Sequence, residues 1–245
     1  MINAIRCMPS PYGLEIVESC LTCKLREDYL FCNLSQPALQ ALEQIKSTAS
    51  YPKGAVLFMQ GQQPRGIFVL CHGRAKLSSS SSEGKTIIVR IANPGEVLGL
   101  SSTIGGTAVD VTAETLEPTQ ANFIPRQAFL EFLREHGEAA LRVAQQLSQN
   151  YHSACQEIRS LGLSTSASEK LARLLLDWSA HGWMHSGELR VNVTLTHEEI
   201  AQLIGTSRET VTRAFAELKK KNLIRVKGST LIIRDKAALE TLVLS

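Results

Sequence analysis

Short apolar runs separated by glycines occupy the stretch between residues 51 and 125. The runs are β-branched or aromatic, as in AVLFM, GIFVL and TIIVRI, and the glycines between them are Gly54, Gly61, Gly66, Gly73, Gly84, Gly95 and Gly99. Short runs with regular turn signals are typical of strands in an all-β roll or barrel. The serines at 78–82, followed by Glu83 and Gly84, predict a solvated hairpin loop with no function of its own.

From Arg126 onward the apolar period lengthens to that of a helix. Apolar residues recur at alternating steps of four and three at Ala140, Ala144, Leu147, Tyr151, Ala154, Ile158 and Leu161. This is a heptad seam sustained over about three heptads. One interpretation is a helix that lies on its own β-roll. Small residues early in the seam and larger ones later favour two helices in close approach, so we expect a homodimer helix. LSTSAS at 163–168 predicts a hinge into a third segment.

The third segment predicts two short helices joined by a tight turn. Thr196 and Glu199 have the spacing of a capping box, which starts a helix that runs through Ile204. Gly205 ends this helix, and Thr206 or Ser207 can cap the next one. The unit is a helix-turn-helix.

The second of these helices has one polar and one apolar face. At 100° per residue the polar face contains Arg208, Glu209, Thr212, Arg213 and Ala216, and the apolar face contains Val211, Ala214, Phe215 and Leu218. Arginine bonds guanine O6 and N7 in the major groove, and glutamate accepts from cytosine N4. The alternative is a salt-bridged solvent face, but the surrounding unit favours DNA recognition.

A basic segment follows the recognition helix. KKK at 219–221 precedes LIRVKGSTLIIR, which predicts a β-hairpin, or wing, turning at 227–229. Residues 194–236 hold nine Lys or Arg against five Asp or Glu, a local charge of +4 in a chain of net charge +3. Positive charge therefore collects where phosphates would lie. We expect Ser207, Lys219 and Lys227 to join Arg208, Glu209, Thr212 and Arg213 in binding double-stranded DNA.

Composition restricts the class of protein. The 245 residues are 44% apolar and 20% charged, as in ordinary globular proteins. No apolar run approaches the roughly 20 residues that span a membrane, and the start lacks a charged region followed by an apolar one. We therefore expect a cytoplasmic protein with no membrane contact. In that compartment the six cysteines favour metal or redox chemistry over disulfides.

Three of the cysteines are clustered. CLTCKLREDYLFC places Cys20, Cys23 and Cys32 in an N-terminal arm ahead of the roll. A CxxC step lets two thiolates reach one metal or cluster, and the third returns after a loop. An iron–sulfur cluster, a thiol redox switch and structural zinc are the alternatives. Cys155, beside the seam, is expected to be a packing residue.

The order of β-roll, long helix and winged helix-turn-helix carrying IGTSRETVTR resembles the CRP/FNR family of bacterial transcription regulators, from about residue 36 onward. The resemblance implies an α+β chain with a cyclic-nucleotide-binding-like roll (37–137), a dimerisation helix (138–163) and a winged helix-turn-helix domain (164–245), preceded by the Cys-rich arm (1–36). It implies base contacts by Arg208, Glu209 and Arg213, a TGTGA-like half-site, and RNA polymerase as a partner. A two-fold dimer requires a palindromic site.

The cysteine trio resembles that of the oxygen-sensing FNR branch, in which a distant fourth cysteine completes a [4Fe-4S] site. The gap from Cys23 to Cys32 is longer here, and Asn122 stands at the position of the distant cysteine. Cys71 in VLCHG is the first candidate for the fourth ligand. Asp28 and His72 are the second candidates, and spacing does not choose among them.

By the same comparison we do not expect cyclic AMP to be the effector. Members that bind it carry a glutamate for the ribose and an arginine followed by a hydroxyl residue for the phosphate. An ungapped comparison places Leu100, Asp110 and Val111 at these positions, and Ala154 and Cys155 at the pair that contacts the base. An aspartate repels a phosphate.

Two further classes remain as alternatives. One is a DNA-binding dimer whose roll binds an organic effector or haem, with His72, His136 or His152 as a haem ligand. The other is an enzyme that uses Cys71 and His72. Adjacent strand residues point to opposite faces, so we expect no catalysis from this pair.

Overall fold

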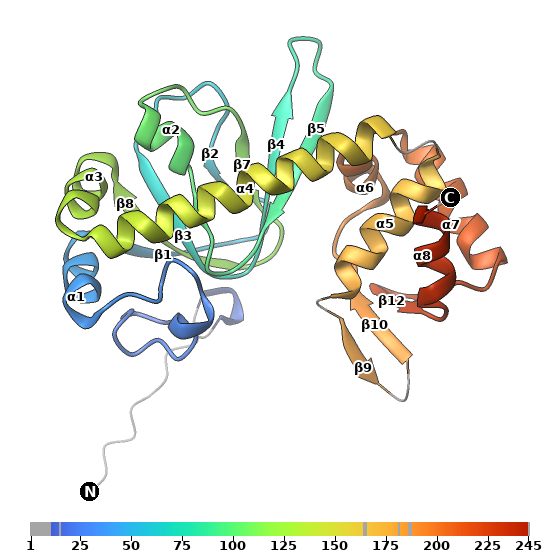
Figure 1. The fold of residues 1–245 in the computed structure, drawn as a ribbon, viewed down its shortest axis with the longest axis horizontal. Coiled ribbons are helices and arrows are strands. Elements are labelled where there is room, and N and C mark those ends of the chain that lie inside the picture. The colour runs from blue at the N-terminus through green and yellow to red at the C-terminus, as the bar shows by residue number, and fades with distance from the viewer. Residues whose placement is uncertain (1–10, 15, 164–165, 181, 186–187, 245) are drawn as a thin grey trace, which may run out of the picture. The chain divides into compact units, whose positions relative to one another are not determined.

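The fold is described from a computed structural model, in which residues 11–14, 16–163, 166–180, 182–185 and 188–244 are described. The chain divides into two compact units, residues 1–152 and 153–245, and helix α4 contributes to both (Figure 1). No helix among the described residues is long and apolar enough to cross a membrane.

The N-terminal unit is a β-roll with helices on its outside. In chain order its elements are the 3-10 turns η1 (Pro11–Gly13) and η2 (Arg26–Asp28), α1 (Gln36–Ile45), β1 (Ser47–Tyr51), β2 (Val56–Phe58), β3 (Gly66–His72), β4 (Ala75–Ser80), β5 (Thr86–Ala92), β6 (Val97–Leu98), α2 (Leu100–Gly105), β7 (Thr112–Thr115), β8 (Thr119–Pro125), α3 (Arg126–Glu135) and α4 (Gly137–Leu163).

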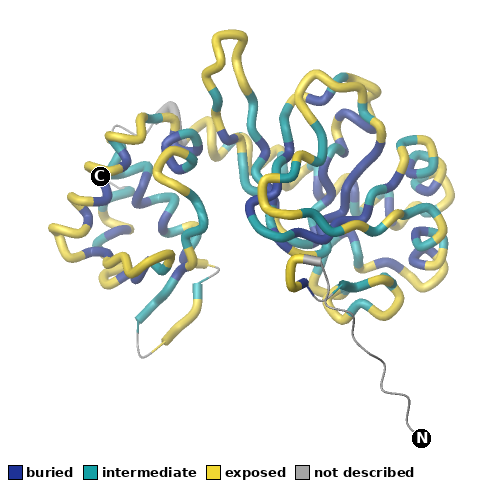
Figure 2. The backbone as a smooth tube through the Cα atoms, turned by 180° about the vertical axis from the view of Figure 1, so that it is seen from behind, coloured by how far each residue is buried: buried dark blue, intermediate teal, exposed yellow. Residues whose placement is uncertain are grey.

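Two four-stranded sheets form the roll, with strand orders β1-β8-β3-β6 and β2-β7-β4-β5. The predicted roll is confirmed. The serine run is only partly a loop, because Ser78, Ser79 and Ser80 continue β4, where they pair with β5. The turn is confined to residues 81–85, and the tip of this hairpin is exposed (Figure 2).

The first sheet separates two apolar cores. Along β3, Ile67 and Val69 pack on the side of α1 and α3, while Phe68 and Leu70 fill the interior of the roll. This alternation is the ordinary period of a strand. On β8, Ile124 joins the outer core in the same way.

The first half of helix α4 packs against the roll. Ala139 and Val143 are buried, and Leu147 is partly buried against the outer core. Gln146, also buried, donates from Nε2 to the Val97 carbonyl at 2.9 Å and accepts from the Val97 N–H at 3.1 Å. The early part of α4 therefore follows the interpretation of a helix that lies on its own roll.

The predicted seam lies mostly on the other side of α4. Leu141, Tyr151 and Ile158 are exposed by 58%, 69% and 69%. Among the predicted seam residues, Ala140 and Leu147 are half-buried, and Ala144, Tyr151, Ala154 and Ile158 are exposed. The side chain of Leu161 lies outside the described residues. Tyr151, Ala154 and Ile158, which follow the last residue packed on the roll, are thus an exposed part of the seam.

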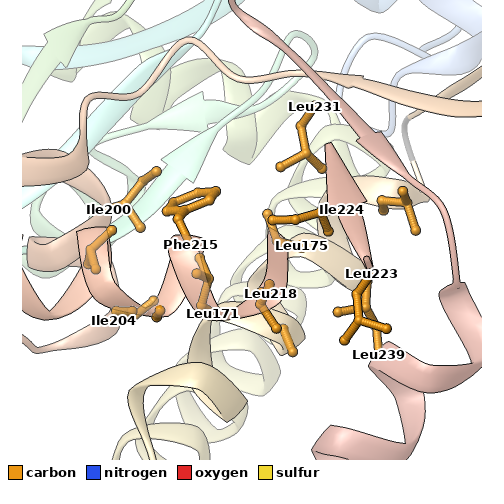
Figure 3. Packing of buried hydrophobic residues seen from close by; sticks show 14 of the residues in the cluster. Leu171, Leu175, Ile200, Ile204, Phe215, Leu218, Leu223, Ile224, Leu231 and Leu239 are labelled. Carbon is orange, nitrogen blue, oxygen red and sulfur yellow. The ribbon is translucent and has the colours of Figure 1, made fainter. Parts of the chain in front are cut away.

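The C-terminal unit is a helical domain with a small sheet. Its elements are α5 (Ala167–Ser179), β9 (Trp183–His185), β10 (Glu188–Asn192), α6 (His197–Ile204), α7 (Arg208–Lys220), β11 (Ile224–Lys227), β12 (Thr230–Ile233) and α8 (Lys236–Leu244). The sheet has the order β11-β12-β10-β9. Leu171 and Leu175 of α5 form the centre of the core with Phe215 and Leu218 of α7 (Figure 3).

Candidate DNA interface and cysteine cavity

The turn between α6 and α7 is built from local signals. The Thr196 side chain accepts from Glu199 N at 3.2 Å, and Thr196 N donates to Glu199 Oε2 at 2.9 Å, which confirms the predicted capping box. Gly205 ends α6 in a left-handed conformation, φ 65°, that L side chains rarely adopt. Ser207 then caps α7 by accepting from Thr210 N at 3.2 Å. The helix-turn-helix is confirmed.

Helix α7 buries one face and exposes the other, as predicted. Val211, Ala214, Phe215 and Leu218 are buried in the core. Arg208, Glu209, Thr212 and Arg213 are exposed. The exposed face therefore carries donors and an acceptor that are available to a ligand.

Glu209 and Arg213 are held in place near the start of α7. The pKa of Glu209 is lowered, first by a hydrogen bond from its own backbone N–H, then by one from Ser207 and by the charges of Arg208 and Arg213. Arg213 donates to Thr210 Oγ1 at 3.2 Å. An ionised glutamate accepts only, which is the role that a cytosine N4 donor requires.

His197 is a residue of this surface that the sequence interpretation missed. Its ring stacks on Phe215 at 5.0 Å between centroids, and Nδ1 shares a hydrogen bond of 2.9 Å with Thr212 Oγ1. Partial burial lowers the pKa of His197, followed by the charges of Lys219 and Arg208. His197 therefore orients Thr212 from the neighbouring helix. In the sequence, a single histidine after a capping threonine does not indicate a contact with Thr212 or Phe215.

The basic segment is exposed beside this helix. Lys219, Lys220 and Lys227 are exposed, and Lys221 pairs with Glu217 at 2.7 Å. The predicted wing is confirmed as the β11–β12 hairpin, in which Lys227 pairs with Thr230 across the turn. The unit thus has exposed lysines at the end of α7 and on the wing that are available to a phosphate backbone.

The four cysteines considered as metal ligands line one cavity of the N-terminal unit. They come from the arm and from β3, and they are Cys20, Cys23, Cys32 and Cys71. Val69 and Cys71 of β3 both line this cavity. A bulge falls between Leu70 and His72 in the pairing with β8. His72 and Asp28, the other candidate ligands, do not line this cavity.

Burial is the main cause of the raised pKa of three of these thiols, those of Cys20, Cys32 and Cys71. It raises the pKa of Cys20 to about 12 and that of Cys71 to about 11, and it raises the pKa of Cys32 as well. The charge of Lys46 acts in the opposite direction on Cys20 and Cys71. Repulsion between thiolates adds to the rise in pKa, because Cys20, Cys23 and Cys71 each raise the pKa of Cys32. Binding of a metal group to them must therefore release protons.

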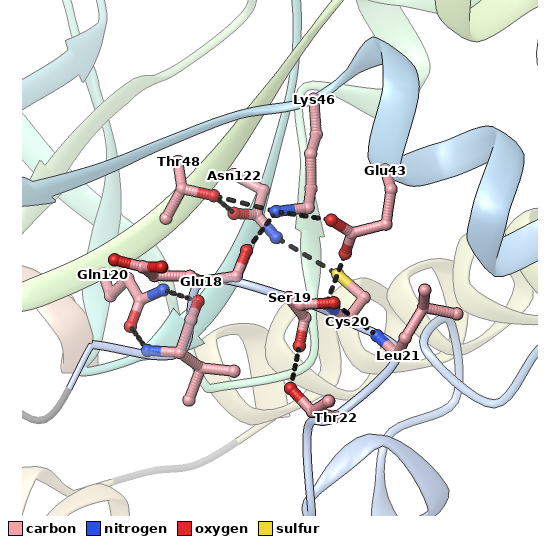
Figure 4. Close-up of polar contacts among 11 residues, drawn as sticks. Glu18, Ser19, Cys20, Leu21, Thr22, Glu43, Lys46, Thr48, Gln120 and Asn122 are labelled. Carbon is pink, nitrogen blue, oxygen red and sulfur yellow. Dashed lines mark hydrogen bonds and ion pairs between the residues drawn. The ribbon is translucent and has the colours of Figure 1, made fainter.

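Polar groups surround Cys20 (Figure 4). Asn122 Nδ2 donates to Cys20 Sγ at 3.6 Å, and the Cys20 N–H donates to Glu43. Lys46 Nζ lies 3.6 Å from Glu43 Oε2, with only 5% of the lysine side chain exposed. Thr48 donates to Asn122 Oδ1 at 2.7 Å. The Asn122–Cys20 contact joins residues 102 positions apart in sequence.

The cavity itself is small. Its volume is about 40 Å³, room for a few water molecules. Among the residues described here, no three Cys, His, Asp or Glu side chains are close enough to hold one metal ion. The donor set of four thiols suits an iron–sulfur cluster, but such a cluster fits only if the loop of residues 20–32 moves outward when it binds.

The cysteine arm is attached to the roll by two aromatic residues. Phe31 is fully buried and its ring lies 6.4 Å from that of Phe129. The ring of Tyr29 covers Gly95, where an added Cβ would lie 2.4 Å from it. Further along, Gln120 exchanges hydrogen bonds of 2.9 and 2.6 Å with the backbone of Val17. Because the ring of Tyr29 lies on Gly95, movement of the arm would affect the turn before β6.

A separate cleft of about 590 Å³ opens on the roll. Tyr51, Phe58, Phe68 and Phe123 line it, and the Phe68 and Phe123 rings are 5.0 Å apart. Arg65 is at its exposed rim. The cleft can accept a ligand that is largely apolar.

The residues aligned with a cyclic-nucleotide cassette are apolar or acidic. Leu100 starts α2 and is buried, Val111 packs against the interior of the roll, and Asp110 is exposed. Cys155, the expected packing residue, is half-buried on α4. His136, a candidate haem ligand, is the C-cap residue of α3, and its ring centroid lies 4.8 Å from that of Phe132. His72 and His152 are exposed.

Comparison with known proteins finds similarity along most of the chain. The family model of the cyclic nucleotide-binding domain matches residues 48–136, and that of the Crp-like helix-turn-helix domain matches residues 169–242. A CRP-like cAMP-activated global transcriptional regulator of Mycobacterium tuberculosis is 26% identical over 86% of this chain and 94% of that protein. The transcriptional activator protein FnrL of Cereibacter sphaeroides is 27% identical over 91% of each. The structure of FixK2 from Bradyrhizobium japonicum superposes with a TM-score of 0.72, at 20% identity, over 81% of this chain and 97% of that one.

Proposed function

The chain is a DNA-binding transcription regulator of the CRP/FNR family, and on this premise we propose that it reads a palindromic site with helix α7 and responds to oxygen or redox state through a cluster held by four cysteines. Regulators of this family are dimeric and are not enzymes. The exposed strip of α4, with Tyr151 and Ile158, supplies the apolar surface for the dimer.

Base recognition is assigned to the exposed face of α7. Arg208 and Arg213 donate to guanine, and Glu209 accepts from cytosine, in a TGTGA-like half-site. Ser207 and Thr212 lie on the same exposed side, and Lys219 and Lys227 contact phosphates. Because the dimer is two-fold, the two half-sites form a palindrome about one helical turn apart.

The observation that supports the sensor is that Cys71 lines the same cavity as Cys20, Cys23 and Cys32. Asn122, at the position of the distant cysteine in the FNR branch, lies opposite Val69 in the β3–β8 ladder. Cys71 is two residues from Val69, and both line the cavity. In this proposal the neighbouring strand β3 supplies the fourth thiol.

The cluster, when bound, supplies a group that oxygen or nitric oxide can degrade. Cys20, Cys23, Cys32 and Cys71 would hold it with thiolates and the arm would cover it. The turn at Gly95 and the Gln146–Val97 pair would connect it to α4. A cluster that binds the dimeric state more tightly shifts the chain toward that state. RNA polymerase is the expected partner on DNA.

The test is metal analysis of protein purified without oxygen. We expect about four iron and four sulfide per chain, a loss of both in Cys71→Ser, and no loss in Cys155→Ser, the matched control. The double variant Cys71→Ser with Asn122→Cys is expected to regain the cluster, because both positions face the cavity. One zinc per chain, or a Cys71→Ser variant with a full cluster, would contradict the four-cysteine assignment.

A second candidate is an organic effector in the aromatic cleft beside Tyr51 and Phe58. Relatives include a cAMP-activated regulator, but Leu100 and Asp110 oppose a ribose and a phosphate, so cyclic AMP is expected to leave the melting temperature unchanged. A flat aromatic acid that raises it in the wild type, and not in Phe58→Ala, would favour this candidate.

A further inference from the structure

His197 is held beside the exposed polar face of α7 by two contacts. Its ring stacks on Phe215, with 5.0 Å between the ring centroids and 5° between the ring planes. Its Nδ1 shares a hydrogen bond of 2.9 Å with Thr212 Oγ1. The exposed ring is therefore fixed by a buried side chain on one face and by a hydroxyl at its edge.

The Thr212 hydroxyl determines which ring nitrogen of His197 carries the proton. Thr212 Oγ1 also lies 2.9 Å from the Arg208 carbonyl, and because a carbonyl can only accept, the single hydroxyl proton is donated there. The hydroxyl oxygen must then accept from His197, which places a proton on Nδ1. In the neutral ring Nε2 is therefore unprotonated, and among the residues that the structure describes it has no hydrogen-bond partner.

Cations lie near this ring in the free chain. Partial burial lowers the pKa of His197 first, and the charges of Lys219 and Arg208 on α7 lower it further. On its own helix, Glu199 is engaged in the capping box and Glu198 is exposed to solvent. The neutral ring is thus favoured in the free chain, and an anion beside Nε2 would favour the protonated ring instead.

The place of His197 in the helix-turn-helix indicates which anion this is. In such a unit the second helix enters the major groove, and the first helix crosses the sugar–phosphate backbone of the DNA. His197 is the first residue of α6, which is the first of the two helices, and its ring contacts the exposed face of α7. A phosphate oxygen accepts hydrogen bonds, so it can bind Nε2 only when Nε2 carries a proton.

We propose that His197 binds a DNA phosphate through Nε2, and that Nε2 takes up a proton from solvent as this contact forms, so that the chain binds DNA more tightly as the pH falls. The phosphate raises the pKa of His197 in the complex above its value in the free chain. The gain in affinity is therefore complete below the pKa of the free chain and is lost as the pH rises through the pKa of the complex.

The experiment measures DNA affinity by fluorescence anisotropy from about pH 5.5 to about pH 8.5, a range that spans the ordinary histidine pKa of about 6.5. A palindromic TGTGA-like duplex and an unrelated duplex are both used, because a phosphate contact does not depend on base sequence. On each duplex, wild-type affinity should rise toward low pH by about tenfold for each His197 whose pKa the phosphate raises by about one unit. The slope of log K against log salt should be steeper at low pH by about 0.9 for each phosphate that His197 neutralises.

Variants separate a phosphate contact from simple support of Thr212. His197→Asn keeps a side-chain N–H for Thr212 but cannot be protonated, so its affinity should stay at the high-pH value of the wild type over the whole range. His197→Arg has a permanent charge and should bind tightly at every pH. His185→Gln, at an exposed histidine of the same unit, is the matched control and should keep the wild-type pH dependence.

Two results would overturn the proposal. If His197→Asn reproduces the wild-type affinity at every pH, the ring only supports Thr212. If the wild-type salt slope is the same at both ends of the pH range, protonation of His197 neutralises no phosphate. Failure of the proposed half-site gives a different result, in which the palindrome and the unrelated duplex bind equally well while both affinities still depend on pH through His197.

Discussion

Arg208 offers the most direct test of how the chain reads DNA. Its side chain is exposed on the first turn of α7, outside the core that holds the helix. Arg208→Ala should therefore leave the melting temperature unchanged and act on DNA binding alone. Arg134→Ala, at an exposed position of α3, is a control for the loss of one positive charge.

The magnitude follows from the dimer. One bidentate arginine–guanine pair discriminates by about 1–3 kcal/mol. A two-fold dimer loses two such pairs, roughly 2–6 kcal/mol, and since about 1.4 kcal/mol is a tenfold change in affinity, Kd should rise by about 30-fold to more than 10⁴-fold. Arg134→Ala should change it by less than about twofold, because an exposed charge outside the DNA-binding unit is screened by salt.

The assay is fluorescence anisotropy with a palindromic TGTGA-like duplex and with duplexes substituted at each guanine of the half-site. Wild-type protein should lose affinity on the duplex whose contacted guanine is replaced, whereas Arg208→Ala should bind that duplex and the parent equally. If Arg208→Ala weakens binding to all duplexes alike, the arginine contacts a phosphate and the assignment of a base contact is refuted.

Three further variants test other parts of the structure. Lys219→Ala should weaken binding to every duplex and reduce the slope of log K against log salt by about 0.9 for each phosphate that the variant no longer neutralises; an unchanged slope would exclude a phosphate as the partner of Lys219. Thr196→Ala should destabilise the C-terminal unit by about 1 kcal/mol in denaturant unfolding, because the capping box is removed. Gly95→Ala should displace the Tyr29 ring and speed alkylation of the arm cysteines, whereas Gly84→Ala, also at positive φ but with open space around it, should not; equal rates in the two variants would show that Tyr29 does not hold the arm.

The helix-turn-helix could be predicted because its signals are local. Thr196 and Glu199 are three residues apart, Gly205 follows directly, and the apolar positions of α7 repeat at the helical period. None of these features depends on distant parts of the chain. The length and caps of α6 and α7 in the structure therefore agree with the sequence pattern.

The surroundings of the cysteines could not be predicted in the same way. Asn122 meets Cys20 across 102 positions, and Lys46 was an ordinary lysine between a helix and a strand in the sequence. The alternation along β3 does contain a usable signal. Ile67 and Val69 are on the outer face, and an unbroken strand period would favour Cys71 over His72 for that face. The bulge between Leu70 and His72 interrupts that period, so only the structure shows that Cys71 lines the cavity.

The seam residues of α4 divide between a part that packs on the roll and a part that is exposed. Its regular heptad spacing predicted a single apolar strip, but Leu147 packs against the roll while Tyr151 and Ile158 remain exposed. A heptad pattern cannot say which neighbour a residue contacts. The point along α4 at which contact with the roll stops depends on where the roll ends.

The amide of Gln146 imitates one rung of a β-ladder, since it satisfies both the N–H and the C=O of Val97 on the edge strand β6. A turn of α4 about its own axis would leave these buried groups unpaired, at about 1–3 kcal/mol for each. These two hydrogen bonds thereby fix the rotation of α4 about its own axis relative to the sheet. A signal that reaches α4 must then travel as tilt or translation shared with β6, and not as torsion of the helix on the roll.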